Sequence, residues 1–109
     1  MELSIFWTQF AEDKLKDIFD YYKVKAGLKT AKKIIREIVD ITNQLEKHPE
    51  IGTIEELLIH RPQKFSFLVS SNYKIIYYIN YIKQRIVIAN IFDVRQNPIK
   101  INETQSDLI

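Results

Sequence analysis

The sequence contains no cysteine and only two glycines among its 109 residues. Without cysteine there is no disulfide framework and no thiolate chemistry. The chain also has no P-loop and no dinucleotide-binding fingerprint, since Gly27 and Gly52 are too far apart to belong to either motif. It carries no G-x-S-x-G motif. The sequence therefore favours none of the common nucleotide-binding or hydrolase classes.

Long hydrophobic runs are also missing. The first residues, MELSIFWTQF, have no basic segment followed by an apolar one, so they do not resemble a signal peptide. The longest apolar runs are far below the roughly 20 residues that a membrane-spanning helix needs. We therefore expect a soluble, cytoplasmic protein.

Metal-binding motifs and a large net charge are absent as well. His48 and His60 lie outside the spacing of short zinc motifs, so we expect no metal site and no cofactor. The formal charge of +2 is too small to indicate nucleic-acid binding by itself. The basic residues cluster, however, and the densest group is Lys23, Lys25, Lys29, Lys32, Lys33 and Arg36. This group is either a solvated face or a surface that binds a partner.

Two runs rich in Ile, Val and Tyr, residues 73–82 and 85–94, are typical of strands, and Lys83-Gln84 between them predicts a hairpin. Alternation places Ile86, Ile88, Phe92 and Val94 on one face of the second strand. It places Arg85, Asp93 and Arg95 on the other face of that strand. In the first strand it places Lys74 and Tyr78 on the same face. We expect one face to be buried and the other to be partly polar.

Two amphipathic helices are predicted before these strands. Thr8 is a suitable N-cap for the first helix, and Gly27 fits the break between the two. The second helix, residues 28–47, carries the strongest apolar periodicity, which includes Ile34, Ile38 and Leu45. We expect the apolar stripes of both helices to meet the Ile86, Ile88 and Phe92 set in one core.

With a short strand at residues 3–7 and another at 65–69, the element order is β-α-α-β-β-β. This order predicts an α+β fold in which a two-helix hairpin packs on one face of an antiparallel sheet. The second face of the sheet is then left free. We expect a single domain over residues 1–100, followed by a poorly ordered tail at residues 101–109.

The strand pair contains YKIIYYI and ends in D-V-R-Q-N-P, and an L-x-x-x-P-x-x-G motif precedes it at Leu45, Pro49 and Gly52. In order and spacing, residues 3–100 resemble the RelE/ParE superfamily of toxins, which includes plasmid stabilisation proteins. The resemblance implies the toxin of a type II toxin–antitoxin system, with a small acidic antitoxin as its partner. A homodimer and a toxin–antitoxin hetero-oligomer both remain open.

If the chain cleaves mRNA on the ribosome, as RelE-type toxins do, the resemblance implies that Lys74, Arg95 and Tyr78 form the catalytic site. The candidate residues for binding a substrate or partner are Arg61, Lys64, Arg85, Lys32, Lys33 and Arg36. Some of these residues are equally well explained by a structural role. Arg95 is equally suited to a salt bridge with Asp93, and tyrosines in strands more often pack across the sheet.

One departure from the RelE pattern separates the alternatives. RelE-type nucleases place a tyrosine or histidine shortly after the last strand, whereas residues 96–101 here are QNPIKI. Asp93 would replace that proton carrier only if its pKa were raised, and a neighbouring arginine has the opposite effect. The sequence therefore favours a ParE-like inhibitor of DNA gyrase over a ribosome-dependent nuclease. A catalytically silent binding module of the same fold is the third alternative.

Overall fold

The structure, a computed structural model, describes residues 3–105. Its five strands form one sheet in the order β1-β5-β4-β3-β2, in which β1 runs parallel to β5 and the other pairs are antiparallel. The elements are β1 (Ser4–Trp7), α1 (Gln9–Ala26), α2 (Leu28–Asn43), η1 (Gln44–Glu46), β2 (Thr53–Ile54), η2 (Glu56–Leu58), β3 (Ser66–Ser70), β4 (Tyr73–Asn80), β5 (Arg85–Asp93) and η3 (Pro98–Glu103). The predicted α+β fold is confirmed, with the short strand β2 added at one edge.

The two helices begin and end at the residues that local chemistry favours. The Thr8 hydroxyl accepts a hydrogen bond from the Ala11 N–H at 3.1 Å, which caps α1. Gly27 separates the helices with a φ of 96°, a conformation that costs a residue without Cβ little. The second helix stops at Asn43 rather than Lys47, because its last turn tightens into the 3-10 turn η1.

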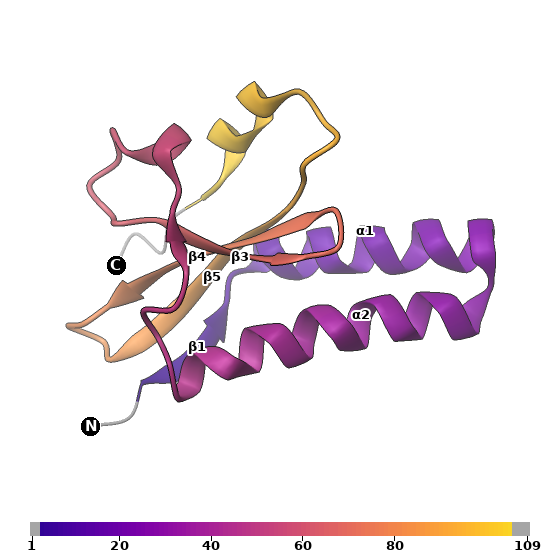
Figure 1. Ribbon diagram of the computed structural model, residues 1–109, viewed down its shortest axis with the longest axis horizontal. Coiled ribbons are helices and arrows are strands. Elements are labelled where there is room, and N and C mark those ends of the chain that lie inside the picture. The colour runs from indigo at the N-terminus through magenta and orange to yellow at the C-terminus, as the bar shows by residue number, and fades with distance from the viewer. Residues whose placement is uncertain (1–2, 106–109) are drawn as a thin grey trace.

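Helices α1 and α2 lie side by side on one face of the sheet (Figure 1). Their buried side chains, among them Ala11, Ile18 and Ile38, meet Ile86 and Ile88 from β5 in one hydrophobic cluster. We call this the helix-side core. It confirms that the helical stripes pack on the face that carries Ile86 and Ile88.

A β-bulge in β5 changes which residues belong to that core. Tyr77 pairs with Ile88 and Ile76 pairs with Asn90, so Ala89 is an extra residue in β5. The alternation of side chains therefore reverses beyond the bulge. As a result Ile91, not Phe92, joins the helix-side core. The prediction for Phe92 and Val94 was wrong: Phe92 lies on the other face and Val94 is exposed.

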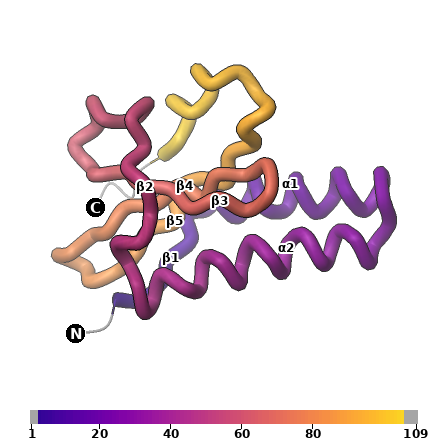
Figure 2. The backbone as a smooth tube through the Cα atoms, in the orientation of Figure 1, coloured from indigo at the N-terminus to yellow at the C-terminus, as the bar shows by residue number. Residues whose placement is uncertain are grey.

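The sequence suggests that the second face of the sheet is free. In the structure this face is covered. Segments η2 and η3 fold over it (Figure 2), and each places one buried side chain, Leu58 and Ile101, on the sheet. These pack with Phe65, Ile76, Tyr78, Val87, Ala89 and Phe92 into a second hydrophobic cluster. We call this the loop-side core. The periodicity of the strands could not reveal it, because its cover comes from irregular segments.

Residues 101–104 are part of the packed structure. Ile101 is 1% exposed, and Arg61 donates hydrogen bonds to the carbonyl groups of Asn102 and Thr104 at 2.7 and 2.8 Å. The expectation of a poorly ordered tail is therefore wrong for residues 101–104. Residues 106–109 of that predicted tail lie outside the described residues.

The β4–β5 hairpin also differs from the prediction. The strands end earlier than expected, so the connection contains residues 81–84 instead of Lys83-Gln84 alone. Ile82, which the sequence placed in the strand, is 97% exposed in this turn. Gln84 adopts a φ of 53°, which allows the chain to reverse before β5.

The L-x-x-x-P-x-x-G motif fixes the segment between α2 and β2 to the sheet. Leu45 is fully buried in the helix-side core. The Tyr77 hydroxyl accepts a hydrogen bond from the Gly52 N–H at 3.0 Å and donates one to the Pro49 carbonyl at 2.9 Å. A Cβ at Gly52 would lie 2.7 Å from Cε1 of the Tyr77 ring, so only glycine permits this approach.

Candidate functional site

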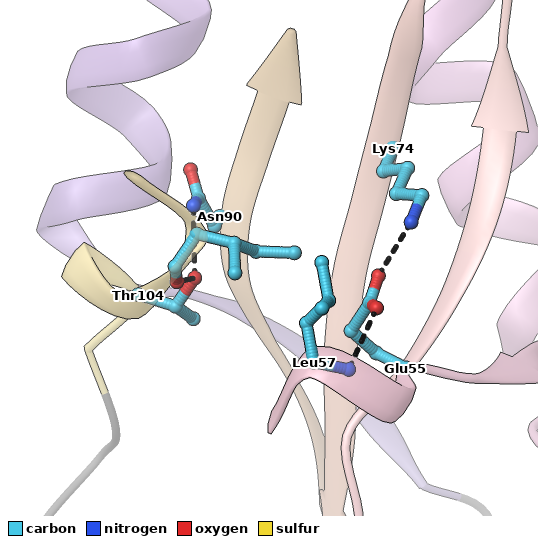
Figure 3. Close-up of polar contacts among 6 residues, drawn as sticks. Glu55, Leu57, Lys74, Asn90 and Thr104 are labelled. Carbon is cyan, nitrogen blue, oxygen red and sulfur yellow. Dashed lines mark hydrogen bonds and ion pairs between the residues drawn. The ribbon is translucent and has the colours of Figure 1, made fainter. Parts of the chain in front are cut away.

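Lys74 and Glu55 form a partly buried ion pair on the loop side of the sheet (Figure 3). The Lys74 Nζ lies 2.7 Å from Oε2 of Glu55, whose side chain is 3% exposed. The second Glu55 oxygen accepts a hydrogen bond from the Leu57 N–H at 3.2 Å, and the ammonium group lies 4.2 Å from the centre of the Phe67 ring. Because these contacts occupy the Lys74 ammonium group, the lysine has a structural role.

Tyr78 lies on the same face of β4 as Lys74, as alternation predicted, but it is only 4% exposed. Its ring packs edge-to-face against Phe65, with the ring centres 5.2 Å apart. This is the packing alternative named above. A buried ring in this position cannot stack on a base without a rearrangement of the loop-side core.

Arg95 is not on the face where the sequence placed it. The bulge at Ala89 shifts the alternation, so Asp93 and Arg95 turn towards α1 rather than towards Lys74 and Arg85. The Arg95 guanidinium holds Asp93 with hydrogen bonds of 2.9 and 3.0 Å. This contact lowers the pKa of the Asp93 carboxylate, as expected beside an arginine. The structure therefore does not bring Arg95 together with Lys74.

A cavity of about 360 Å³ lies where Arg95 approaches α1. It is lined by Phe10, Lys14, Asp17, Ile18, Tyr21, Tyr73, Asn90, Ile91, Phe92, Asp93, Arg95, Gln96, Lys100 and Glu103. Asn90 is 1% exposed and donates from Nδ2 to the Thr104 hydroxyl at 2.9 Å (Figure 3), whereas its Oδ1 has no partner among the described residues. Asn90, which lines the cavity, thus carries a buried hydrogen-bond acceptor that is not satisfied within the described residues.

Of the other basic candidates, Arg61 and Lys64 line one small cavity of about 180 Å³, whereas Arg85 does not. Arg61 binds the two η3 carbonyl groups described above, so it fixes the C-terminal segment. The Arg85 guanidinium stacks on Phe6, 3.9 Å from the ring centre. Lys64 is exposed and borders a second cavity, which Gly52 and Tyr77 also line. These three residues do not form one phosphate-binding surface.

Lys32, Lys33 and Arg36 are the candidates that remain open to a partner. All three are exposed on the outer side of α2, and none forms an ion pair with any residue in the described range 3–105. With Lys23, Lys25 and Lys29 they surround the end of the helical hairpin, and we call these six residues the basic hairpin end.

Residues 3–105 contain no group of three or more His, Cys, Asp or Glu side chains placed to hold a metal ion. Within the same range, neither long helix has the continuous apolar character needed to cross a membrane.

Comparison with known proteins decides the family. A family model described as "ParE toxin of type II toxin-antitoxin system, parDE" matches residues 5–98. The chain belongs to the ParE toxin family. A search of curated proteins found no match. A solved structure described as "Chromosomal ParDE TA system from P. aeruginosa" has the same fold, with a TM-score of 0.70 and 23% identity over 84% of this chain and 96% of that one.

Some residues that shape this ParE-family site were not identified from the sequence. Glu55 is one, because a single carboxylate in an irregular segment shows no pattern that pairs it with Lys74. Asn90 and Thr104 are others, since their contact joins a strand to a segment that the sequence assigned to a free tail. The sequence contained one signal for this contact: Asn90 is a polar residue inside an otherwise apolar strand, and such residues need a hydrogen-bond partner when they are buried.

Proposed function

We propose that this chain is the toxin of a type II toxin–antitoxin pair, that it inhibits DNA gyrase, and that a small acidic antitoxin neutralises it. The observation that supports this most strongly is the match of the ParE toxin family over residues 5–98. The family description names the parDE system, and we extend that partnership to this chain.

The geometry argues against RNA cleavage on the ribosome, and this supports the gyrase alternative. An RNA-cleaving site needs cations that hold the phosphate and a group that moves protons. Here Lys74 is bound to Glu55, Tyr78 is buried, and Arg95 lies on the opposite face. Asp93 is also a poor proton carrier, because its contact with Arg95 lowers the pKa of its carboxylate.

Two assays run side by side test this proposal. The purified chain should inhibit supercoiling by gyrase, or trap cleaved DNA, and should leave mRNA intact on translating ribosomes. Lys74→Ala and Arg95→Ala test whether any mRNA cleavage depends on these two cations. Arg95→Ala is the better of the two variants, since Lys74→Ala also leaves the buried Glu55 carboxylate without its partner and so destabilises the fold.

Each other outcome contradicts the proposal in a different way. Cleavage in the ribosomal A site that disappears in Arg95→Ala and Lys74→Ala would assign the chain to the nuclease class. Inactivity in both assays would favour the silent binding module. For the antitoxin, expression of a short neighbouring reading frame that encodes an acidic protein should restore the growth of cells that express the chain.

A further inference from the structure

Charge is distributed very unevenly along this chain. Residues 21–36 contain six basic side chains and no acidic one, although the whole chain has a formal charge of only +2. The remainder of the molecule therefore carries more acidic than basic residues. A clustered patch of this kind, rather than the total charge, marks a surface that attracts polyanions.

Four of these residues form a stripe along α2. Lys29, Lys32, Lys33 and Arg36 follow the helical spacing i, i+3, i+4 and i+7, so they share one side of the helix over about 10 Å. The buried residues of α2, Ala31, Ile38 and Thr42, lie on the opposite side. The packing of the helix on the sheet thus directs all four cations to solvent.

The structure leaves these charges unneutralised and accessible. None of the six side chains of the basic hairpin end has an ion pair or a hydrogen bond to another described residue, whereas Lys16, on the same hairpin, is paired with Asp20 at 2.7 Å. The first turn of α2 contains no acidic residue, so the positive end of the helix dipole adds to the field. The connection between the helices also projects past the sheet (Figures 1 and 2).

We infer that the basic hairpin end binds the phosphate backbone of duplex DNA. This inference goes beyond gyrase inhibition and does not depend on it, since the chain alone should bind DNA. An acidic protein segment is the rival occupant. Folded segments of that kind bury an apolar face in a groove, yet none of the cavities described above is lined by any residue from 23 to 36. Of the exposed apolar residues nearby, Val24 and Leu28 belong to none of these cavities, and Tyr21 lines the first one.

Binding of a fluorescent duplex, measured by anisotropy at several salt concentrations, tests the inference. The logarithm of the association constant should fall with the logarithm of the salt concentration, with a slope of about −0.9 for each phosphate neutralised. Two duplexes of different sequence should bind equally, because contacts to phosphates carry no sequence information. Lys29→Gln/Lys33→Gln should make the slope shallower by about 2.

The matched control is Lys47→Gln/Lys83→Gln, which removes the same charge. Lys47 follows the C-terminal end of α2, and Lys83 lies in the β4–β5 turn. In Figure 1 both of these segments lie at the opposite end of the molecule from the connection between α1 and α2. Glutamine has a helix propensity close to that of lysine, so the double variant in α2 should fold. Lys47 and Lys83 lie in turns outside the helices. Circular dichroism checks the fold of both variants. The control should keep the slope of the unmodified chain.

Three results would overturn the inference. The first is no detectable binding of DNA at about 20 mM salt, where phosphate contacts are strongest. The second is an equal change of slope in both double variants, which would show general attraction. The third is binding of polyglutamate as tightly as DNA at the same salt concentration, which would assign the surface to an acidic protein. Gyrase inhibition, assayed separately on the same variants, distinguishes failure of this inference from failure of the proposed function.

Discussion

At the scale of single residues, Tyr77 connects the sheet to the segment that leaves α2. Its hydroxyl group is both an acceptor, from the Gly52 N–H, and a donor, to the Pro49 carbonyl. Tyr77 is 2% exposed, whereas Pro49 and Gly52 are half-buried, so both hydrogen bonds are partly shielded from water. The family motif at Pro49 and Gly52 is thereby explained by packing and not by catalysis.

Tyr77→Phe should lower the free energy of unfolding by about 1–3 kcal/mol, because it removes two partly buried hydrogen bonds worth about 0.5–1.5 kcal/mol each. Chemical denaturation measures this loss. Tyr81→Phe is the matched control, because the Tyr81 hydroxyl bonds to Glu50 at the exposed surface. A control that loses as much stability as Tyr77→Phe would show that burial of the hydroxyl is not the cause.

The buried tyrosines should also make the fold sensitive to alkali. Burial raises the pKa of Tyr77 and of Tyr73 above the usual 10.0, and the contact with Tyr22 adds to the effect at Tyr73. Below pH 10 both folded and unfolded states keep the protons, so stability is unaffected. Above it the unfolded chain loses protons first, and stability falls by about 1.4 kcal/mol per pH unit for each such tyrosine.

Urea denaturation between about pH 9 and pH 11.5 measures this dependence. Tyr73→Phe should reduce the slope above pH 10, since one of the two groups is then missing. The same slope in Tyr73→Phe as in the unmodified chain would mean that Tyr73 ionises as readily in the folded state as in the unfolded state.

At the scale of elements, η3 is the cover of the loop-side core. Ile101→Ala should cost about 2–5 kcal/mol, as large-to-small changes at buried positions do. Ile99→Ala, two residues earlier in the same segment, should cost less than about 0.5 kcal/mol because Ile99 is 67% exposed. Denaturation of both variants compares them directly. Equal losses would indicate that η3 does not pack on the sheet in solution.

The elements that could be predicted are those specified by local sequence. The cap at Thr8, the break at Gly27 and the helical stripe around Ile38 each depend on residues within a few positions of one another. The register of β5 depends instead on a bulge, and no residue near Ala89 in the sequence indicates that the strand has an extra residue there. One inserted residue reverses the alternation, so it moved both Phe92 and Arg95 to unexpected faces.

The candidate site was harder to predict than the fold for a related reason. The sequence identified the cationic residues, but their partners, such as Glu55 for Lys74 and the η3 carbonyl groups for Arg61, come from irregular segments. Such contacts join residues 19 to 43 positions apart and follow no periodicity. By contrast, the basic hairpin end was visible in the sequence, because helical spacing alone determines which way its side chains point.

At the scale of the whole molecule, the sheet has a hydrophobic core on each face. Strands β4 and β5 contribute to both: Ile75 and Ile88 face the helices, whereas Ile76 and Val87 face η2 and η3. Loss of either core therefore removes half of the packing that holds the central strands in place. The two cores should unfold as one cooperative unit.

Trp7 offers a probe of this coupling, since it is the only tryptophan and packs against the helix-side core. Its fluorescence and the far-ultraviolet circular dichroism should give the same denaturation midpoint. Leu58→Ala, which removes a fully buried side chain from the loop-side core, should shift both midpoints together, as Ile38→Ala should from the other face. If Leu58→Ala moved the dichroism midpoint and left the Trp7 midpoint in place, the faces would unfold independently. Segments η2 and η3 could then detach while the helices stay packed, and Tyr78 and Lys74 would become accessible without global unfolding.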